Sequence, residues 1–232
     1  MSYWALLLTS LPIIFFWHSP VVYPVKLFVV LLHEISHGLA AVATGGSIVR
    51  IEISADLGGI CYVRGGLPFA VLTAGYLGSM CWGGLILVTA SRMKAARFLS
   101  FLVGGSVLTV TVLYVRNASG LLFGLLFAAA MCWLARWAAS GINRIVLTAI
   151  GLVSVLYPVI DIKDDLITRQ VARSDATMLA ERYFGTSLMW GLIWGIMSLI
   201  LAFTFIRMSI NNGKQSGRPH SKRDRPARLR KG

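Results

Sequence analysis

Residues 22–43 read VYPVKLFVVLLHEISHGLAAVA, an apolar segment that carries the pattern HExxH at positions 33–37. The segment is long enough to cross the hydrocarbon core of a bilayer as a helix, for which about 20 apolar residues suffice. Within it stand His33, Glu34 and His37, which are costly to bury in lipid unless they have partners or a function. The segment therefore predicts a membrane helix with a chemically active centre.

The spacing within this segment indicates a metal site. Histidines four residues apart lie on one face of a helix, so the imidazoles of His33 and His37 can hold one metal ion. Imidazole suits zinc, and two such ligands leave room for a third protein ligand and a water molecule. Glu34 can take a proton from that water without binding the metal. We therefore expect His33 and His37 to bind Zn²⁺ and Glu34 to be the general base.

The third metal ligand must come from elsewhere, because no acid or histidine follows soon on the same helix. We predict Asp161, since it ends an apolar run where a carboxylate can lie at membrane depth. Pro158, three residues earlier, would kink that helix and free backbone carbonyls near the site. A competing interpretation makes Asp161 an ordinary acidic helix end at the interface. The alternatives for the third ligand are Asp164, Asp165 and Asp175.

The composition places the whole chain in a membrane. Of the 232 residues, 56% are hydrophobic and 13% are charged, and the mean hydropathy is +0.73. A soluble domain of this length needs more polar surface than that. The 3 cysteines stand singly, and an odd number argues against a disulfide framework. We therefore expect one compact membrane domain without disulfides.

Apolar runs recur along the chain and predict an all-α polytopic membrane protein with six or seven transmembrane helices. The break at residues 47–63 is rich in β-branched residues around a glycine-containing turn, which predicts a short re-entrant β-hairpin. The break at about 162–185 is polar and predicts an interfacial helix from Asp175 to Tyr183, with Ser174 as its N-cap. The apolar runs are 3–17, 22–43, 68–90, 97–115, 119–138, 142–161 and 187–209.

The end of the chain is strongly basic. Eight Lys and Arg residues stand between Lys214 and Lys231, against the single acid Asp224. A basic segment directly after an apolar run is typical of a cytoplasmic tail that contacts anionic headgroups, and nothing near it is typical of a nucleic-acid reader. We expect a membrane domain over residues 1–209 and a disordered basic tail over residues 210–232. We expect this multi-pass protein in the cell membrane, in contact with the lipid bilayer and not with nucleic acid.

Three features together resemble the site-2 protease family of intramembrane metalloproteases, and its M50B-like branch in particular. They are the HExxH on a membrane helix, the glycine-rich hairpin, and the distant pair Pro158 and Asp161. Two further stretches are similar to that branch as well: AGYLGS at residues 74–79, which opens the next apolar run, and DIKDD at residues 161–165 followed by SDA at residues 174–176. The resemblance covers about residues 22–90 and 150–180.

The resemblance implies a zinc ion held by two histidines and one aspartate, and cleavage of a transmembrane segment of a membrane-protein substrate. Carried over by position, the ligands are His33, His37 and Asp161, and the base is Glu34. The sequence departs from the family pattern at one point, because Ile162 follows Asp161 where the family usually has glycine.

The sequence therefore predicts a zinc-dependent intramembrane endopeptidase, the type of enzyme that acts in regulated intramembrane proteolysis. A metal transporter would show ionisable residues repeated across several spans or an internal repeat, and the sequence shows neither. The alternative is a proteolytically silent relative that binds membrane proteins, although every residue of the HExxH is present. For the hairpin two roles stay open: a strand edge that pairs with an unwound substrate, or a wall that closes the cavity.

Overall fold

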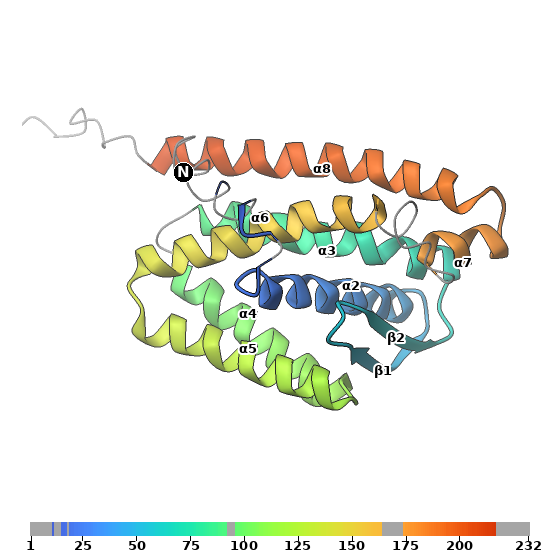
Figure 1. Cartoon of the computed structure of the whole chain (residues 1–232), viewed down its shortest axis with the longest axis horizontal. Helices are drawn as coiled ribbons and strands as arrows, with labels where there is room; N and C mark the ends of the chain where they lie inside the picture. The colour runs from blue at the N-terminus through green and yellow to red at the C-terminus, as the bar shows by residue number, and fades with distance from the viewer. Residues whose placement is uncertain (1–10, 12–14, 18, 92–95, 164–173, 217–232) are drawn as a thin grey trace, which may run out of the picture.

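The fold is a bundle of long helices with one small β-hairpin (Figure 1). The computed structural model describes residues 11, 15–17, 19–91, 96–163 and 174–216. In chain order the elements are α2 (Tyr23–Ala43), β1 (Ser47–Ile53), β2 (Gly59–Arg64), α3 (Pro68–Ala90), α4 (Ala96–Tyr114), α5 (Ala118–Trp137), α6 (Ser140–Lys163), α7 (Asp175–Arg182) and α8 (Ser187–Ser216).

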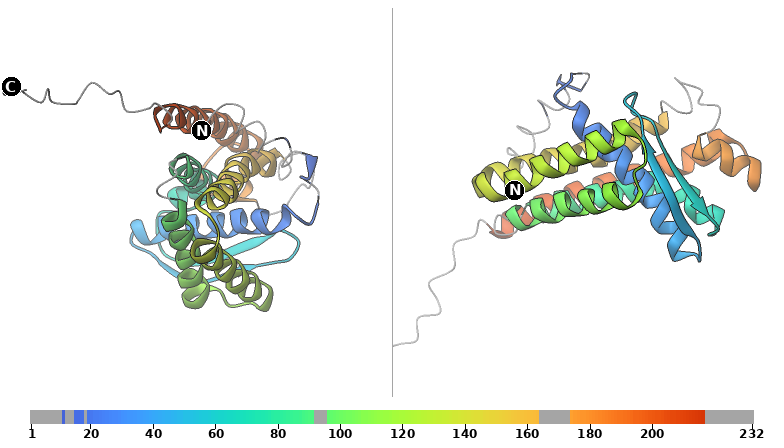
Figure 2. Two further views of the ribbon diagram at one scale, coloured as in Figure 1. Left: turned by 90° about the vertical axis from the view of Figure 1, so that its left-hand side faces the viewer. Right: turned by 90° about the horizontal axis from the view of Figure 1, so that it is seen from below.

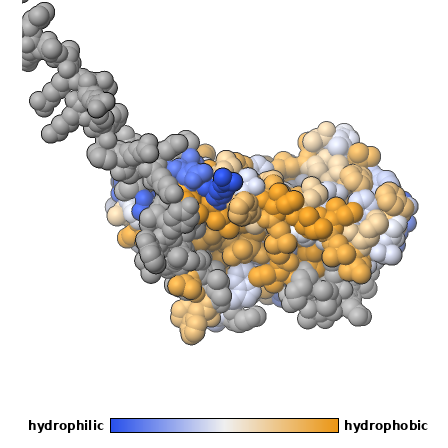
Figure 3. Space-filling view, turned by 90° about the horizontal axis from the view of Figure 1, so that it is seen from above, coloured by the Kyte–Doolittle hydropathy of each residue, from blue (hydrophilic) through white to orange (hydrophobic). Residues whose placement is uncertain are grey.

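Within the described residues, 6 helices are long and apolar enough to cross a bilayer, namely α2, α3, α4, α5, α6 and α8. The prediction of an all-α polytopic membrane fold with a small hairpin is confirmed, and the protein is a multi-pass integral membrane protein. The predicted run 3–17 falls largely outside the described residues. The surface over α8 is predominantly apolar (Figure 3), with exposed side chains such as Ile196 and Phe203. Such a surface is suited to contact with lipid.

Helix α3 lies in the middle of the bundle, in contact with α2, α6 and α8 (Figures 1 and 2). Its crossing with α6 is close because Gly151 of α6 has no side chain. A Cβ there would lie 2.8 Å from the backbone nitrogen and Cα of Leu87 on α3. Small residues allow this kind of close backbone approach between membrane helices. The crossing holds α6 against the same helix that packs on α2.

The hairpin has the strands that the sequence predicts. β1 and β2 pair antiparallel, with Ser47 opposite Arg64 and Ile53 opposite Gly59. The hairpin packs on α2, and β1 also contacts α4 and α5 (Figure 2). Helices α2 and α6 both end at the end of the bundle where the hairpin and α7 lie (Figure 1). Among the described residues, the hairpin and α7 therefore lie at the same end of the bundle.

The polar segment after α6 contains the predicted short helix. α7 begins at Asp175, and the Ser174 hydroxyl accepts a hydrogen bond from the Thr177 backbone N–H at 3.2 Å, so Ser174 is its N-cap. Helix α8 continues to Ser216, past the predicted domain boundary at residue 209. The rest of the predicted basic tail, residues 217–232, lies outside the described residues.

Candidate metal centre

The HExxH directly follows the continuously buried run Lys26–Leu32 of α2, the helix that packs against α3, α6 and the hairpin. Glu34 is 5% exposed and His37 is 7% exposed. The rings of His33 and His37 stand next to each other on one face, with centroids 4.6 Å apart and planes at 79°. The helical spacing therefore brings the two imidazoles together, as the sequence predicts.

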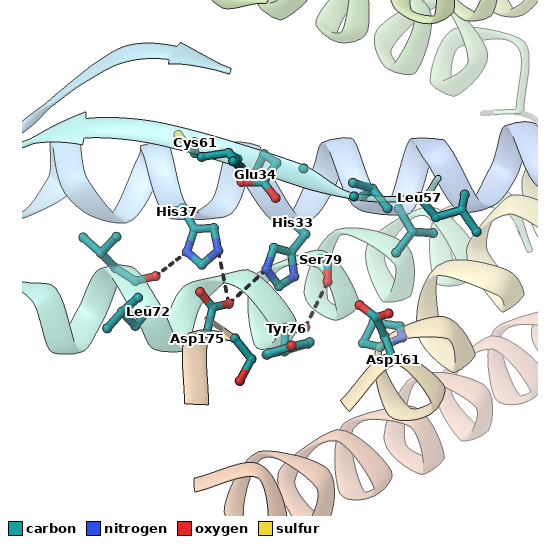
Figure 4. A pocket seen from close by; sticks show the side chains of 18 of the residues that line it. His33, Glu34, His37, Leu57, Cys61, Leu72, Tyr76, Ser79, Asp161 and Asp175 are labelled. Atoms are coloured by element: carbon teal, nitrogen blue, oxygen red, sulfur yellow. Dashed lines mark hydrogen bonds and ion pairs between the residues drawn. The ribbon is translucent and has the colours of Figure 1, made fainter. Parts of the chain in front are cut away.

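A carboxylate from a distant part of the chain completes the group. Oδ2 of Asp175, the first residue of α7, lies 3.0 Å from Nε2 of His33 and 3.2 Å from Nε2 of His37 (Figure 4). The three ligand atoms all lie within 4.8 Å of one another. Burial by itself would raise the pKa of Asp175, but the two imidazoles outweigh it and hold this pKa below its usual range. The carboxylate is therefore ionised at neutral pH, as a metal ligand must be.

The surroundings of the histidines fix how their rings are oriented. Nδ1 of His37 lies 2.7 Å from the Val71 carbonyl oxygen, so it donates a hydrogen bond there and leaves Nε2 free toward Asp175. The ring of Tyr76 packs edge-on against His33, with centroids 4.7 Å apart and planes at 82°. Both Val71 and Tyr76 belong to α3, so this helix orients both imidazoles.

The donor set and the space around it fit a zinc ion. Two imidazole nitrogens and one carboxylate oxygen form a common zinc donor set. Ligands of a tetrahedral zinc with bonds of about 2.0–2.1 Å lie about 3.3 Å apart, close to the two distances from Asp175. Gly75 of α3 keeps room for the rings, because a Cβ there would lie 2.4 Å from Nε2 of His33 and 2.6 Å from Cε1 of His37.

Glu34 stands beside this group, facing the hairpin. Its carboxylate accepts a hydrogen bond from the backbone of Cys61 in β2. Gly59, two residues earlier in β2, has no side chain where a Cβ would lie 2.5 Å from Oε1 of Glu34. Figure 4 shows β2 crossing directly over Glu34. The Cys61 hydrogen bond therefore holds the Glu34 carboxylate next to the metal ligands, and the missing side chain at Gly59 leaves room for it.

These residues line a cavity of about 800 Å³. One wall is β2 and the turn before it, from Asp56 to Val63. The opposite walls come from α3, α6 and α7, and His33, Glu34 and His37 lie between them. The cavity gives an extended peptide room next to the histidines and the carboxylates.

Comparison with known proteins identifies the family of the chain. A family model described as Peptidase M50B-like matches residues 6–205, from ahead of α2 into α8. The chain belongs to the Peptidase M50B-like family. Comparison with curated proteins found no match, and comparison with solved structures found none either. The predicted resemblance to the M50B-like branch is thereby confirmed.

In this M50B-like protein the structure brings Asp175, one of the alternatives for the third ligand, to the two histidines, whereas the predicted Asp161 stands apart from them. Among the described residues, the His, Cys, Asp and Glu side chains that could share one metal ion are His33, His37 and Asp175. Asp161 is half-buried on the α6 wall of the same cavity and is not a member of that group. The alternatives Asp164 and Asp165 lie outside the described residues.

The packing of α7 explains why Asp175 reaches the histidines. Leu179 is fully buried in a cluster with Tyr76 of α3 and with Trp190 and Trp194 of α8. Asp175 stands four residues before Leu179, so both lie on the buried face of α7. The packing of α7 on α3 and α8 thus places the Asp175 carboxylate beside the histidines of α2. A sequence signal for this was present in the helical spacing of Asp175 and Leu179.

Proposed function

We propose that this M50B-like protein is a zinc-dependent intramembrane endopeptidase that hydrolyses a peptide bond in or near a transmembrane segment of a membrane-protein substrate. The observation that carries the proposal is the convergence of His33, His37 and Asp175 on one another inside a membrane-embedded bundle, with Glu34 beside them. Ionisable groups at such depth are expensive, so their gathering around one cavity indicates a functional site.

Three residues would bind the metal ion, and two neighbours on α3 keep the histidines oriented for it. His33, His37 and Asp175 would hold the ion. A zinc ion held there would supply Lewis acidity and make water acidic enough to lose a proton near neutral pH. The hydrogen bond from His37 to the Val71 carbonyl keeps Nε2 available as a ligand atom, and the Tyr76 ring restricts rotation of His33.

Glu34 is the residue that moves the proton. In the proposed reaction a carboxylate oxygen of Glu34 takes a proton from the attacking water as the water oxygen bonds to the peptide carbonyl carbon. The same carboxyl group then gives the proton to the amide nitrogen as the C–N bond breaks, which leaves a carboxyl and an amino terminus. The Cys61 hydrogen bond and the space at Gly59 hold Glu34 for both transfers.

The hairpin supports a role in presenting the substrate. Strand β2 lines the cavity from Gly59 to Val63, and its partner β1 lies on the side away from the cavity (Figure 4). A helical peptide bond is hidden within its own turn, whereas a segment that pairs with a strand edge is extended and exposes its carbonyl groups. In the proposed reaction the unwound substrate lies along β2 and crosses Glu34.

The test uses protein reconstituted with an unselected mixture of single-span membrane segments. Wild type is compared with Glu34→Gln and His37→Ala, new amino termini are identified by mass spectrometry, and zinc per chain is measured by emission spectroscopy. We expect zinc and new termini with wild type. Glu34→Gln should keep zinc and lose about 10²–10⁴-fold in cleavage rate, and His37→Ala should lose both.

Two results would speak against the proposal. Undiminished cleavage by Glu34→Gln would exclude Glu34 as the base. Wild type that contains zinc and yields no new termini would favour the alternative function, a proteolytically silent module that binds membrane proteins.

A further inference from the structure

Each strand of the hairpin has one outer edge, and the two outer edges face different parts of the molecule. Backbone N–H and C=O groups at membrane depth need hydrogen-bond partners, so an open strand edge is costly there. The outer edge of β2 faces the cavity. The outer edge of β1 faces the connection between α4 and α5.

That connection closes the edge of β1 at Ile51 and Ile53. The backbone N–H of Arg116 donates to the Ile51 carbonyl at 3.1 Å, next to a parallel bridge between Ile51 and Val115. Asn117 then satisfies both backbone groups of Ile53. Its Oδ1 accepts from the Ile53 N–H at 3.1 Å, and its Nδ2 donates to the Ile53 carbonyl at 2.8 Å.

The Asn117 side chain thus takes the place of a neighbouring strand. A carboxamide offers one acceptor and a donor in the arrangement that a peptide group offers. In an antiparallel pair, residues whose hydrogen bonds point outward face each other across the ladder. Ile53 bonds outward to Asn117, and Gly59 lies directly opposite Ile53. The groups of Gly59 therefore point outward on the cavity side.

A series of contacts therefore connects the α4–α5 connection to Glu34, the proposed base. Asn117 holds Ile53, Ile53 pairs with Gly59, and a Cβ on Gly59 would lie 2.5 Å from Oε1 of Glu34. A small shift of the hairpin would therefore move the strand into Glu34 or away from it.

We propose that Asn117 is a positioning residue, which fixes the hairpin so that the cavity-facing edge of β2 lies in register with Glu34. Because β1 is closed at Ile51 and Ile53, an extended substrate segment that passes Glu34 can add only to β2. The expected fall in kcat rests on the proposed endopeptidase function. The expected loosening of the hairpin rests only on the hydrogen bonds of Ile53.

The experiment compares wild type with Asn117→Ala and with Ser119→Ala in the reconstituted protein. Ser119 is the matched control, because its hydroxyl donates to the same Ile53 carbonyl at 2.7 Å and leaves the N–H of Ile53 to Asn117. The first measurement is amide hydrogen exchange of the peptide covering residues 59–64. We expect at least tenfold faster exchange there in Asn117→Ala and less than threefold in Ser119→Ala.

The second measurement separates kcat from KM and records zinc per chain, with a peptide that wild type cleaves. A misplacement of about 1 Å costs about 10²-fold in rate, so kcat of Asn117→Ala should fall about 10- to 100-fold with zinc unchanged. A purely structural defect would instead lower zinc and active protein together. Unchanged exchange over residues 59–64, unchanged kcat, or parallel loss of zinc and activity would each overturn the role of Asn117. Absence of cleavage by wild type would refute the endopeptidase function and leave the exchange result to decide on Asn117.

Discussion

Replacing Gly75 by alanine is the most informative single change in the bundle. The new Cβ would lie 2.4 Å from Nε2 of His33 and 2.6 Å from Cε1 of His37. Non-bonded heavy atoms prefer separations of about 3.5–4.0 Å, so the imidazoles must move by about 1 Å or α3 must withdraw. Zinc–ligand distances tolerate only about 0.2 Å. One methyl group therefore suffices to spoil the site while every proposed ligand is kept.

The size of the effect follows from this overlap. Mutation of residues that only orient metal ligands costs about 10–100-fold in metal affinity. Gly75→Ala would displace the ligands themselves, which is a larger disturbance. We expect zinc affinity to fall by about 10²-fold or more and cleavage to fall at least as much. The matched control is Gly105→Ala in α4, where a Cβ would meet nothing within 4 Å. Alanine favours a helix over glycine by about 1 kcal/mol, so this control should be as stable as wild type or more so.

The assay is competition for zinc with a chromophoric chelator in detergent, with circular dichroism to confirm helix content. Wild type and Gly105→Ala should give the same zinc dissociation constant, and Gly75→Ala a much larger one. Zinc binding by Gly75→Ala as tight as that of wild type would contradict the prediction, because the imidazoles would then not lie against α3.

Three further predictions concern the parts around the ligands. Gly59→Ala places a Cβ 2.5 Å from Oε1 of Glu34, so it should abolish cleavage with zinc per chain unchanged, and loss of zinc would contradict this. Ser174→Ala removes the N-cap of α7 at a cost of about 1 kcal/mol, which corresponds to about fivefold weaker zinc binding. Ser174→Asn should restore the zinc affinity, because asparagine also caps helices, and failure to restore it would refute a capping role. Burial and the nearby Glu34 carboxylate raise the pKa of Cys61 to about 12, so only about 10⁻⁴ of this thiol is thiolate at pH 8. Maleimide labelling of Cys61 in the chelator-treated protein should therefore rise about tenfold per pH unit from pH 7 to 9, whereas a plateau near pH 9 would contradict it.

Much of the fold could be predicted from sequence because membrane helices and short strands leave local signals. The run at residues 22–43 needed only length and hydropathy, and the hairpin needed only β-branched residues around a glycine turn. Ser174 was predictable as an N-cap because its hydroxyl acts within its own helix turn. The pairing of His33 with His37 is equally local, since a single helix turn produces it.

The third ligand was not predictable by the same local argument. Asp161 lies at the end of an apolar run, which is the local signal of a carboxylate at membrane depth. Asp175 lies in a polar segment and reaches the histidines only because Leu179 docks among aromatic residues of α3 and α8. The closure of the β1 edge by Asn117 is a tertiary feature of the same kind. The spacing of Asp175 and Leu179 indicates that both lie on one face of α7, but it does not indicate which helices that face packs against.

The most direct test of the proposed centre is zinc per chain in purified wild type, Asp175→Ala and Asp161→Ala. The geometry predicts about one zinc in wild type and in Asp161→Ala, and loss of zinc from Asp175→Ala, because Oδ2 of Asp175 lies 3.0 and 3.2 Å from the two histidine nitrogens. Zinc kept by Asp175→Ala and lost from Asp161→Ala would contradict this account of the site.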